Sequence, residues 1–170
     1  GRDNVQSIAN NLKWGLDNRI TLAAGRNGGK LVHGKQTVLT LGGKDLSFDP
    51  KTLAVRALTG GIQFGNSFDA WGNRFVCSNS NHIQHVVLPR RYLSRRPGLS
   101  PPSAIRSIAA GGAAAPVFRK SGAEPWRIVR TRRRVSDPKT KARLSRTEQF
   151  AIGFFTSATS VTIYTGNAYP

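Results

Sequence analysis

The stretch that decides the fold is residues 61–87, which read GIQFGNSFDAWGNRFVCSNSNHIQHVV. Runs rich in aromatic and β-branched residues predict three strands, at 64–68, 74–78 and 83–87. The turn between the first two contains Gly72 and Asn73, two residue types that tolerate the positive φ of tight connections. A polar turn at 79–81 leads into the third strand. The pattern therefore predicts an antiparallel sheet with polar side chains where the strands end.

Two other segments repeat parts of this pattern. Asn18–Ile20 aligns with Asn73–Phe75, because each segment follows an apolar strand and an Asp-containing turn and continues as Asn-Arg-hydrophobic. A third, weaker copy of the pattern lies at 157–167. Sheets repeated in this way are typical of β-propellers, whose blades usually have four strands. The residues thus predict an all-β fold built from propeller-like blades.

The length of the chain limits how many blades it can form. A chain of 170 residues is expected to form one domain, 1–170, and a closed propeller has about 4–8 blades. We therefore predict a partial propeller of about four blades, part of a larger ring. A Pro- and Ala-rich insertion is expected at 89–124, with short helices over about 89–110. Strands are expected at 124–130 and 150–164, on either side of a basic loop.

The chain is strongly basic, with a formal net charge of +18 and nine Lys or Arg residues between Arg127 and Arg146. This excess predicts weak, salt-sensitive binding to polyanions. No helix-turn-helix, RNP or zinc-finger pattern is present, so specific nucleic-acid recognition is not expected. The lone Cys77 excludes an internal disulfide and a CxxC metal site. No apolar run approaches the ~18 residues of a membrane-spanning helix, and the cellular compartment stays open.

Oxygen-bearing side chains at the expected strand ends indicate a calcium site. Ca²⁺ takes six to eight oxygen ligands from carboxylates, amides and carbonyls. The candidate metal ligands are Asn79, Asn81, Asp69 and Glu124. The alternative is that the asparagines only shape turns, and that Glu124 forms a structural ion pair with Arg127.

Two histidines and three further residues complete the candidate site. His82 and His85 are the candidate catalytic bases, acting on a bound water or a substrate hydroxyl; alternatively, both pack against a sheet. Gln63, Trp126 and Arg127 are the candidate contacts of a small-molecule substrate. The chain has no G-x-S-x-G, H-E-x-x-H, Walker or G-x-G-x-x-G pattern, so the chemistry of those motifs is not supported.

Several segments together resemble the propeller module of large bacterial membrane-bound dehydrogenases, which are related to calcium-dependent quinoprotein sugar dehydrogenases and to lactonase-type propellers. They are residues 12–18, 60–93, 116–121, 124–135 and 154–170. The resemblance implies a ring of six or seven blades, an ion near its central channel and redox chemistry in the parent protein. This chain lacks a haem-attaching CxxCH, and Gln63 stands where the quinone-binding relatives carry a cation.

Three functions follow as hypotheses. The first is calcium-dependent hydrolysis of lactone-type substrates, because hydrolysis needs only an ion, a water and a base. The second is a fragment of a quinone- or haem-linked sugar or alcohol dehydrogenase, which would need an organic cofactor. The third is a non-catalytic propeller module for binding or assembly. The unpaired strand edges of an incomplete ring also predict a homo-oligomer.

Overall fold

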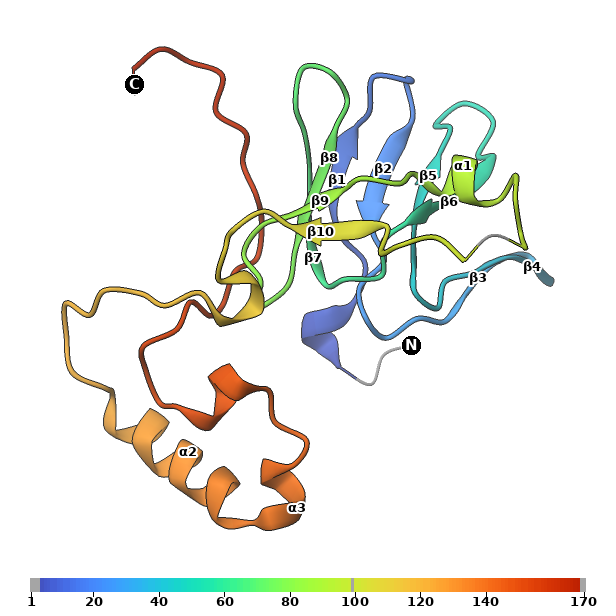
Figure 1. Cartoon of the computed structure of the whole chain (residues 1–170). Coiled ribbons are helices and arrows are strands. Elements are labelled where there is room, and N and C mark those ends of the chain that lie inside the picture. Colours follow the sequence, from blue (N-terminus) through green and yellow to red (C-terminus); the bar gives the residue numbers. More distant parts are fainter. Residues whose placement is uncertain (1–3, 99, 169–170) are drawn as a thin grey trace.

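Antiparallel β-structure dominates the computed structural model, which describes residues 4–98 and 100–168 (Figure 1). Two four-stranded sheets follow one another along the chain. The first contains, in spatial order, β1 (Asn10–Trp14), β2 (Ile20–Ala23), β5 (Lys44–Phe48) and β6 (Val55–Thr59). The second contains β7 (Phe64–Phe68), β8 (Arg74–Cys77), β9 (Gln84–Val86) and β10 (Ile105–Ser107). The predicted all-β class is confirmed. The described strands form two four-stranded sheets, whereas about four blades were expected.

A hairpin interrupts the first sheet between its second and third strands. It consists of β3 (Lys30–His33) and β4 (Gln36–Thr40), which pair only with each other. Its base is closed by the amide of Leu41, which donates to the carbonyl of Gly29 at 2.8 Å. The second sheet has no such hairpin, but the connection from β9 to β10 contains a short helix, α1 (Arg90–Leu93).

The turn between β7 and β8 forms as the sequence predicts. The Asp69 carboxylate accepts hydrogen bonds from the amides of Trp71 and Asn73, at 3.0 and 2.8 Å, and from Asn73 Nδ2 at 2.8 Å. Gly72 has a φ of 83°, a conformation that glycine adopts without steric cost. Desolvation raises the pKa of the Asp69 carboxyl, but these hydrogen bonds outweigh it and leave the pKa below its ordinary value. The carboxylate is thus used to shape the turn.

Helices are few and short. They are η1 (Val5–Ser7), α1 (Arg90–Leu93), η2 (Gly112–Ala114), α2 (Pro125–Ser136), α3 (Pro138–Lys141) and η3 (Arg146–Gln149). The prediction that helix lies mainly at 89–110 is wrong, since α1 is the only helix within that range and α2 is the longest in the part of the chain that the structure describes. No described helix is both long and apolar enough to cross a bilayer.

The segment expected to be a strand at 124–130 begins α2 instead. Pro125 occupies the first turn, where its missing N–H costs nothing. Arginine is a good helix former, and Ile128, Thr131 and Val135 share one face at helical spacing and are half-buried or buried. The helix stops before Pro138, which disfavours helical backbone in the residue that precedes it.

Two other local predictions are also wrong. The Ala-rich segment 103–109 was expected to be helical, yet Ile105 lies opposite Val86 and extends the sheet as β10. Pairing with β9 therefore overrides the local helix preference. The segment 150–164 was expected to return to strands, but its only bridge is between Phe154 and Pro116, and the remainder is extended chain without a ladder.

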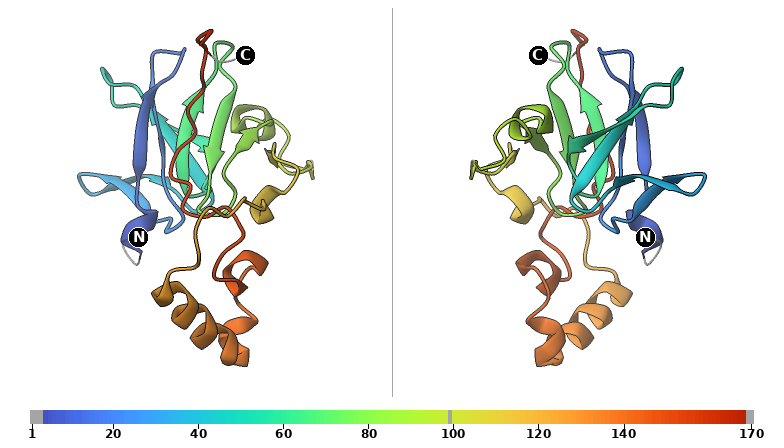
Figure 2. Two further views of the ribbon diagram at one scale, coloured as in Figure 1. Left: turned by 90° about the vertical axis from the view of Figure 1, so that its left-hand side faces the viewer. Right: turned by 90° about the vertical axis from the view of Figure 1, so that its right-hand side faces the viewer.

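That bridge closes the base of a long excursion. Beside the Pro116–Phe154 pair, the Val117 amide donates to the Gly153 carbonyl at 3.0 Å, and the Phe155 amide donates to the Ala115 carbonyl at 2.8 Å. We call residues 118–152 the helical excursion. It contains α2, α3 and η3 and hangs from one end of the sheets (Figure 2).

The two sheets repeat each other at their first and second strands. Both β1 and β7 contain a register shift and a residue with positive φ, Asn11 (56°) and Gly65 (81°). Arg19 directly precedes β2 and Arg74 begins β8, and both side chains are buried, 6% and 7% exposed. The hairpin registers pair Trp14 with Ile20 and Phe68 with Arg74, so Ile20, and not Arg19, is the counterpart of Arg74. The alignment predicted from the sequence is therefore wrong by one residue.

The repetition continues to the end of each sheet. Each fourth strand is followed by a Gly-Gly pair whose second glycine has positive φ. The pair ending at Gly61 (73°) comes directly after β6, and the pair ending at Gly112 (50°) comes three residues after β10. The first strands lie beside each other, because Asn66 Nδ2 on β7 donates to the Asn11 carbonyl on β1 at 3.3 Å.

A buried ion pair joins the two sheets. Arg74 Nη2 on β8 lies 2.6 Å from Asp45 Oδ2 on β5, with side chains 8% and 2% exposed. Arg74 also donates to the Thr59 carbonyl on β6 and to Asn66 Oδ1, both at 2.6 Å. Asp45 Oδ1 accepts from the amides of Ala24 and Gly61 at 2.9 and 3.0 Å. Both charges are therefore paired and hydrogen-bonded, as buried charges require.

The extended C-terminal segment packs on the second sheet. Cys77, Ala158 and Val161 form a buried cluster, flanked by Phe64, Phe75, Ile83 and Ile163. The hydroxyl of Ser67 on β7 donates to the Val161 carbonyl. Cys77 is fully buried, and burial raises the pKa of its thiol to about 11, so it serves as a small core residue.

Candidate functional site

A pocket of about 670 Å³ lies between one end of the sheets and the helical excursion. Its walls come from η1, from the loop after β2, from the ends of β7 and β8, and from α2, η3 and the chain that follows. The polar lining residues are Gln6, Arg26, Gln63, Asn79, Arg127, Arg130, Arg134, Thr147, Glu148, Thr156, Ser157 and Thr159, and the apolar ones are Phe64, Trp126, Phe150, Ala151, Ile152 and Phe154.

Hydrogen bonds hold the sheet side of this pocket. The amide of Asn79 donates to Gln63 Oε1 at 3.2 Å, which ties the end of β8 to the start of β7. Asn79 Oδ1 accepts from the Ser157 amide at 3.1 Å, and the Asn79 carbonyl accepts from the Ala158 amide at 3.2 Å. Asn79 thus fixes the C-terminal segment to the second sheet at the pocket wall.

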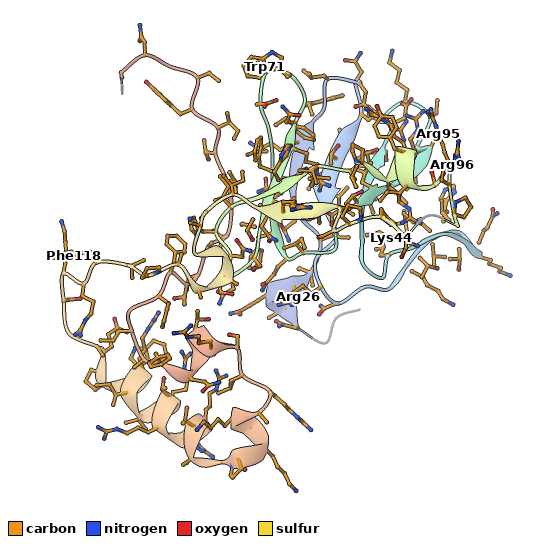
Figure 3. All side chains as sticks on the ribbon, viewed as in Figure 1. Arg26, Lys44, Trp71, Arg95, Arg96 and Phe118 are labelled. Atoms are coloured by element: carbon orange, nitrogen blue, oxygen red, sulfur yellow. The ribbon has the colours of Figure 1, made fainter. Side chains whose placement is uncertain are left out.

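Arginines of α2 form the opposite wall. Arg127, Arg130 and Arg134 are spaced i, i+3 and i+7, so a helix places them on one face, and all three line the pocket. The guanidinium groups of Arg127 and Arg130 lie over the Trp126 ring, 5.3 and 4.9 Å from its centre. Arg26 reaches the pocket from the sheet side, at the sheet end that faces the excursion (Figure 3).

The acidic groups near this wall already have partners. Glu148 lines the pocket, and its carboxylate accepts from the amide and hydroxyl of Ser145 at 3.2 and 2.9 Å, capping η3. Glu124 accepts from Trp126 Nε1 and lies 3.9 Å from Arg127 Nε. Four arginines therefore share the pocket with one lining carboxylate.

The structure brings together four of the nine residues that the sequence predicts for a site. Gln63, Asn79, Trp126 and Arg127 all line the pocket. Glu124 is exposed at the start of α2 and contacts two of them. The predicted ion pair between Glu124 and Arg127 is thus present, at a distance typical of a weak surface pair.

The other predicted residues lie outside the pocket lining. Asp69 is in the turn before β8, at the sheet end where Figure 3 labels Trp71, whereas Asn79 follows the far end of β8. Asn81 is 8% exposed, and its Nδ2 donates to Ser107 Oγ at 2.7 Å. His82 packs on Phe155 with ring centres 4.7 Å apart.

His85 also packs against an aromatic ring, and the candidate metal ligands do not cluster. His85 stacks on Phe75 of the neighbouring strand, with ring centres 5.0 Å apart. Among residues 4–98 and 100–168, no group of three or more His, Cys, Asp or Glu side chains is placed to hold a metal ion. Among the described residues, the pocket thus brings together amide side chains and four arginines with one lining carboxylate, that of Glu148.

A family model described as "Domain of unknown function (DUF7133)" matches residues 1–170. The chain belongs to this family. No curated protein and no solved structure matches it.

In this DUF7133 chain, sequence reasoning missed three of the four pocket arginines. Arg130 and Arg134 were assigned to a strand and a loop, and neither element would place them beside Arg127. The i, i+3, i+7 spacing was the available signal, once a helix starting at Pro125 is recognised. Arg26 gave no signal, because its loop meets α2 only through the tertiary structure.

Proposed function

We propose that this DUF7133 chain is a segment of a β-propeller that serves as a binding and assembly module. The observation that carries the proposal is the repetition of one four-stranded antiparallel sheet, with matching bulges and positive φ values in the first strands, which lie side by side. Propeller blades are four-stranded antiparallel sheets that share a central channel. In this proposal each of the two sheets is one blade, and β1 and β7 are their inner strands.

The C-terminal segment extends the same pattern. Residues 157–164 lie along β7, since Ser67 donates to Val161, and Asn11 Nδ2 on β1 donates to Ser160 Oγ at 3.0 Å. Ser157 also has a positive φ, 68°, as Asn11 and Gly65 have in the first strands. We assign this segment as the inner strand of a third blade. The helical excursion is then an insertion between blades, because the connection between the first two sheets needs only the four residues 60–63.

Two blades cannot close a ring of about 4–8 blades. The first sheet also leaves apolar side chains uncovered, with Leu12 60% and Trp14 64% exposed on its edge strand β1. Leu12 and Trp14 are two residues apart and therefore lie on one face of the sheet, and an exposed apolar face marks an interaction surface. We therefore infer that copies of this chain associate through this face of the first sheet.

Sedimentation velocity across the micromolar range tests this inference. The wild-type chain is expected to associate as its concentration rises, and Trp14→Glu is expected to shift it to monomer. Trp71→Glu is the matched control, because Trp71 is 85% exposed at a turn tip and not on a first strand. A wild-type chain that stays monomeric throughout, or equal effects of both variants, would contradict the assembly role.

Calcium-dependent hydrolysis of a lactone stays a prediction, as does redox chemistry in a larger parent protein. One observation favours a polar ligand near the predicted residues: Asn81 Oδ1 and His82 Nδ1 are buried without a protein hydrogen-bond partner. Buried polar atoms normally have a partner, so this position suits a ligand or a water.

Calcium is then expected to raise the melting temperature, since an ion bound only by the folded state stabilises it. Asn81→Ala is expected to abolish this rise, whereas Asp69→Asn, at the opposite end of the sheet, is expected to keep it. Chelation with EDTA should reverse the rise in the wild-type chain. A melting temperature that does not respond to calcium in any of the three proteins would argue against the calcium site.

A further inference from the structure

We propose that the arginine-lined pocket binds a small organic anion that carries at least two negative charges, as carboxylates or phosphate. The proposal rests on the pocket alone and does not depend on the two sheets being propeller blades. It assigns a ligand class to a site formed jointly by the helical excursion and the sheet ends.

The first argument is convergence. Arg127, Arg130 and Arg134 come from one face of α2, and Arg26 comes from the loop after β2, far away in the sequence. Guanidinium groups repel one another at close range, so a fold that gathers four of them in one pocket gains from a bound anion. Arginine also presents paired donors that match the oxygens of carboxylate and phosphate.

The second argument is the fixed orientation of two of these groups. Arg127 and Arg130 both lie over the Trp126 ring, and the indole Nε1 is in turn held by Glu124. Cation–π contacts restrict the long arginine side chains, so less rotamer entropy is lost when an anion binds. The outward-facing Arg133 on the same helix has no place in the pocket lining.

The third argument is the balance of charge and size. Among the residues that the structure describes, Glu148 is the single acidic residue in the lining, and its carboxylate is engaged by Ser145. A volume of about 670 Å³ exceeds that of a single inorganic ion and falls in the range of small-molecule sites. Phe64, Phe150 and Phe154 add apolar surface, which suits the carbon skeleton of an organic anion.

Isothermal titration calorimetry of the full chain at low salt provides the test, with citrate and inorganic phosphate as separate probes. Citrate supplies several carboxylates on a carbon skeleton, and phosphate supplies the oxyanion alone. We expect saturable binding of at least one probe, with a change in tryptophan fluorescence because Trp126 lines the site. The probe that binds more tightly distinguishes a carboxylate ligand from a phosphate ligand.

Two arginine variants of α2 give the control for general surface charge. Arg130→Gln is expected to weaken binding about tenfold, because charge-assisted hydrogen bonds to an anion are lost. Arg133→Gln removes the same charge from the same helix outside the pocket and is expected to leave the dissociation constant within about twofold of the wild-type value. Melting curves of both variants are the control that each one is folded.

Three outcomes would overturn the proposal. One is the absence of saturable binding of either probe, and another is an equal loss of affinity in Arg130→Gln and Arg133→Gln. The third is preference for a long polyanion such as heparin, with equal sensitivity to both variants, which would assign the basic side chains to a polyanion surface. Loss of self-association in Trp14→Glu has no bearing on these results, so the two proposals fail independently.

Discussion

Asp45→Ala is expected to destabilise the folded chain by about 3–5 kcal/mol, because it leaves the buried Arg74 guanidinium without its counter-charge. The substitution also removes the acceptor of the Ala24 and Gly61 amides, of which the Ala24 amide is then buried without a partner. The ion pair joins β5 of one sheet to β8 of the other, so its loss weakens the contact between the sheets. Urea denaturation followed by tryptophan fluorescence measures the change.

Two further variants test whether the loss of stability comes from the ion pair between Asp45 and Arg74. Asp49→Ala removes another aspartate, one whose carboxylate accepts from the Lys51 and Thr52 amides in an exposed turn, and its effect is expected to be much smaller. Asp45→Asn combined with Arg74→Met removes both charges. Its loss of folding free energy is expected to be less than the sum of the losses caused by Asp45→Asn alone and by Arg74→Met alone. Additive losses would show that Asp45 and Arg74 do not act as a pair.

Gly61→Ala is expected to destabilise the chain by about 2–5 kcal/mol, from backbone strain and overpacking together. Gly61 has a φ of 73°, and a Cβ there would lie 2.5 Å from the Gly43 carbonyl carbon and 2.6 Å from its Cα. These are backbone atoms of the loop before β5, so they cannot move aside as a flexible side chain would. The amide of Gly61 also donates to Asp45, so a shift of Gly61 disturbs the ion pair.

Gly34→Ala is the matched control for strain without crowding. Gly34 has a φ of 60°, but a Cβ there would meet no heavy atom within 4 Å. The expected loss of folding free energy is therefore only the cost of placing alanine in the left-handed region, about 1–2 kcal/mol. Denaturant unfolding of the two variants separates the cost of backbone strain from the cost of overpacking. Equal losses of folding free energy in Gly34→Ala and Gly61→Ala would contradict the crowding at Gly61.

Elements whose chemistry is local follow from the amino-acid sequence alone. The strand Phe64–Phe68 and the turn at Asp69 follow from aromatic residues beside an Asp-Ala-Trp-Gly-Asn turn, and both form as predicted. Patterns of this kind act over a few residues and can therefore be recognised in the sequence. The alignment of Arg19 with Arg74 was wrong by one residue, because the register of each hairpin makes Ile20 the counterpart of Arg74.

The remaining elements and the pocket depend on contacts between distant parts of the chain. Ile105–Ser107 is a strand because β9 offers it an open edge, and 125–136 is a helix whose buried face packs against η3. The pocket gathers Arg26 and three arginines of α2 from distant parts of the sequence, and the pair of Asp45 and Arg74 forms only when the two sheets meet. Long-range pairing and charge burial depend on which surfaces come together, and no local propensity encodes that choice.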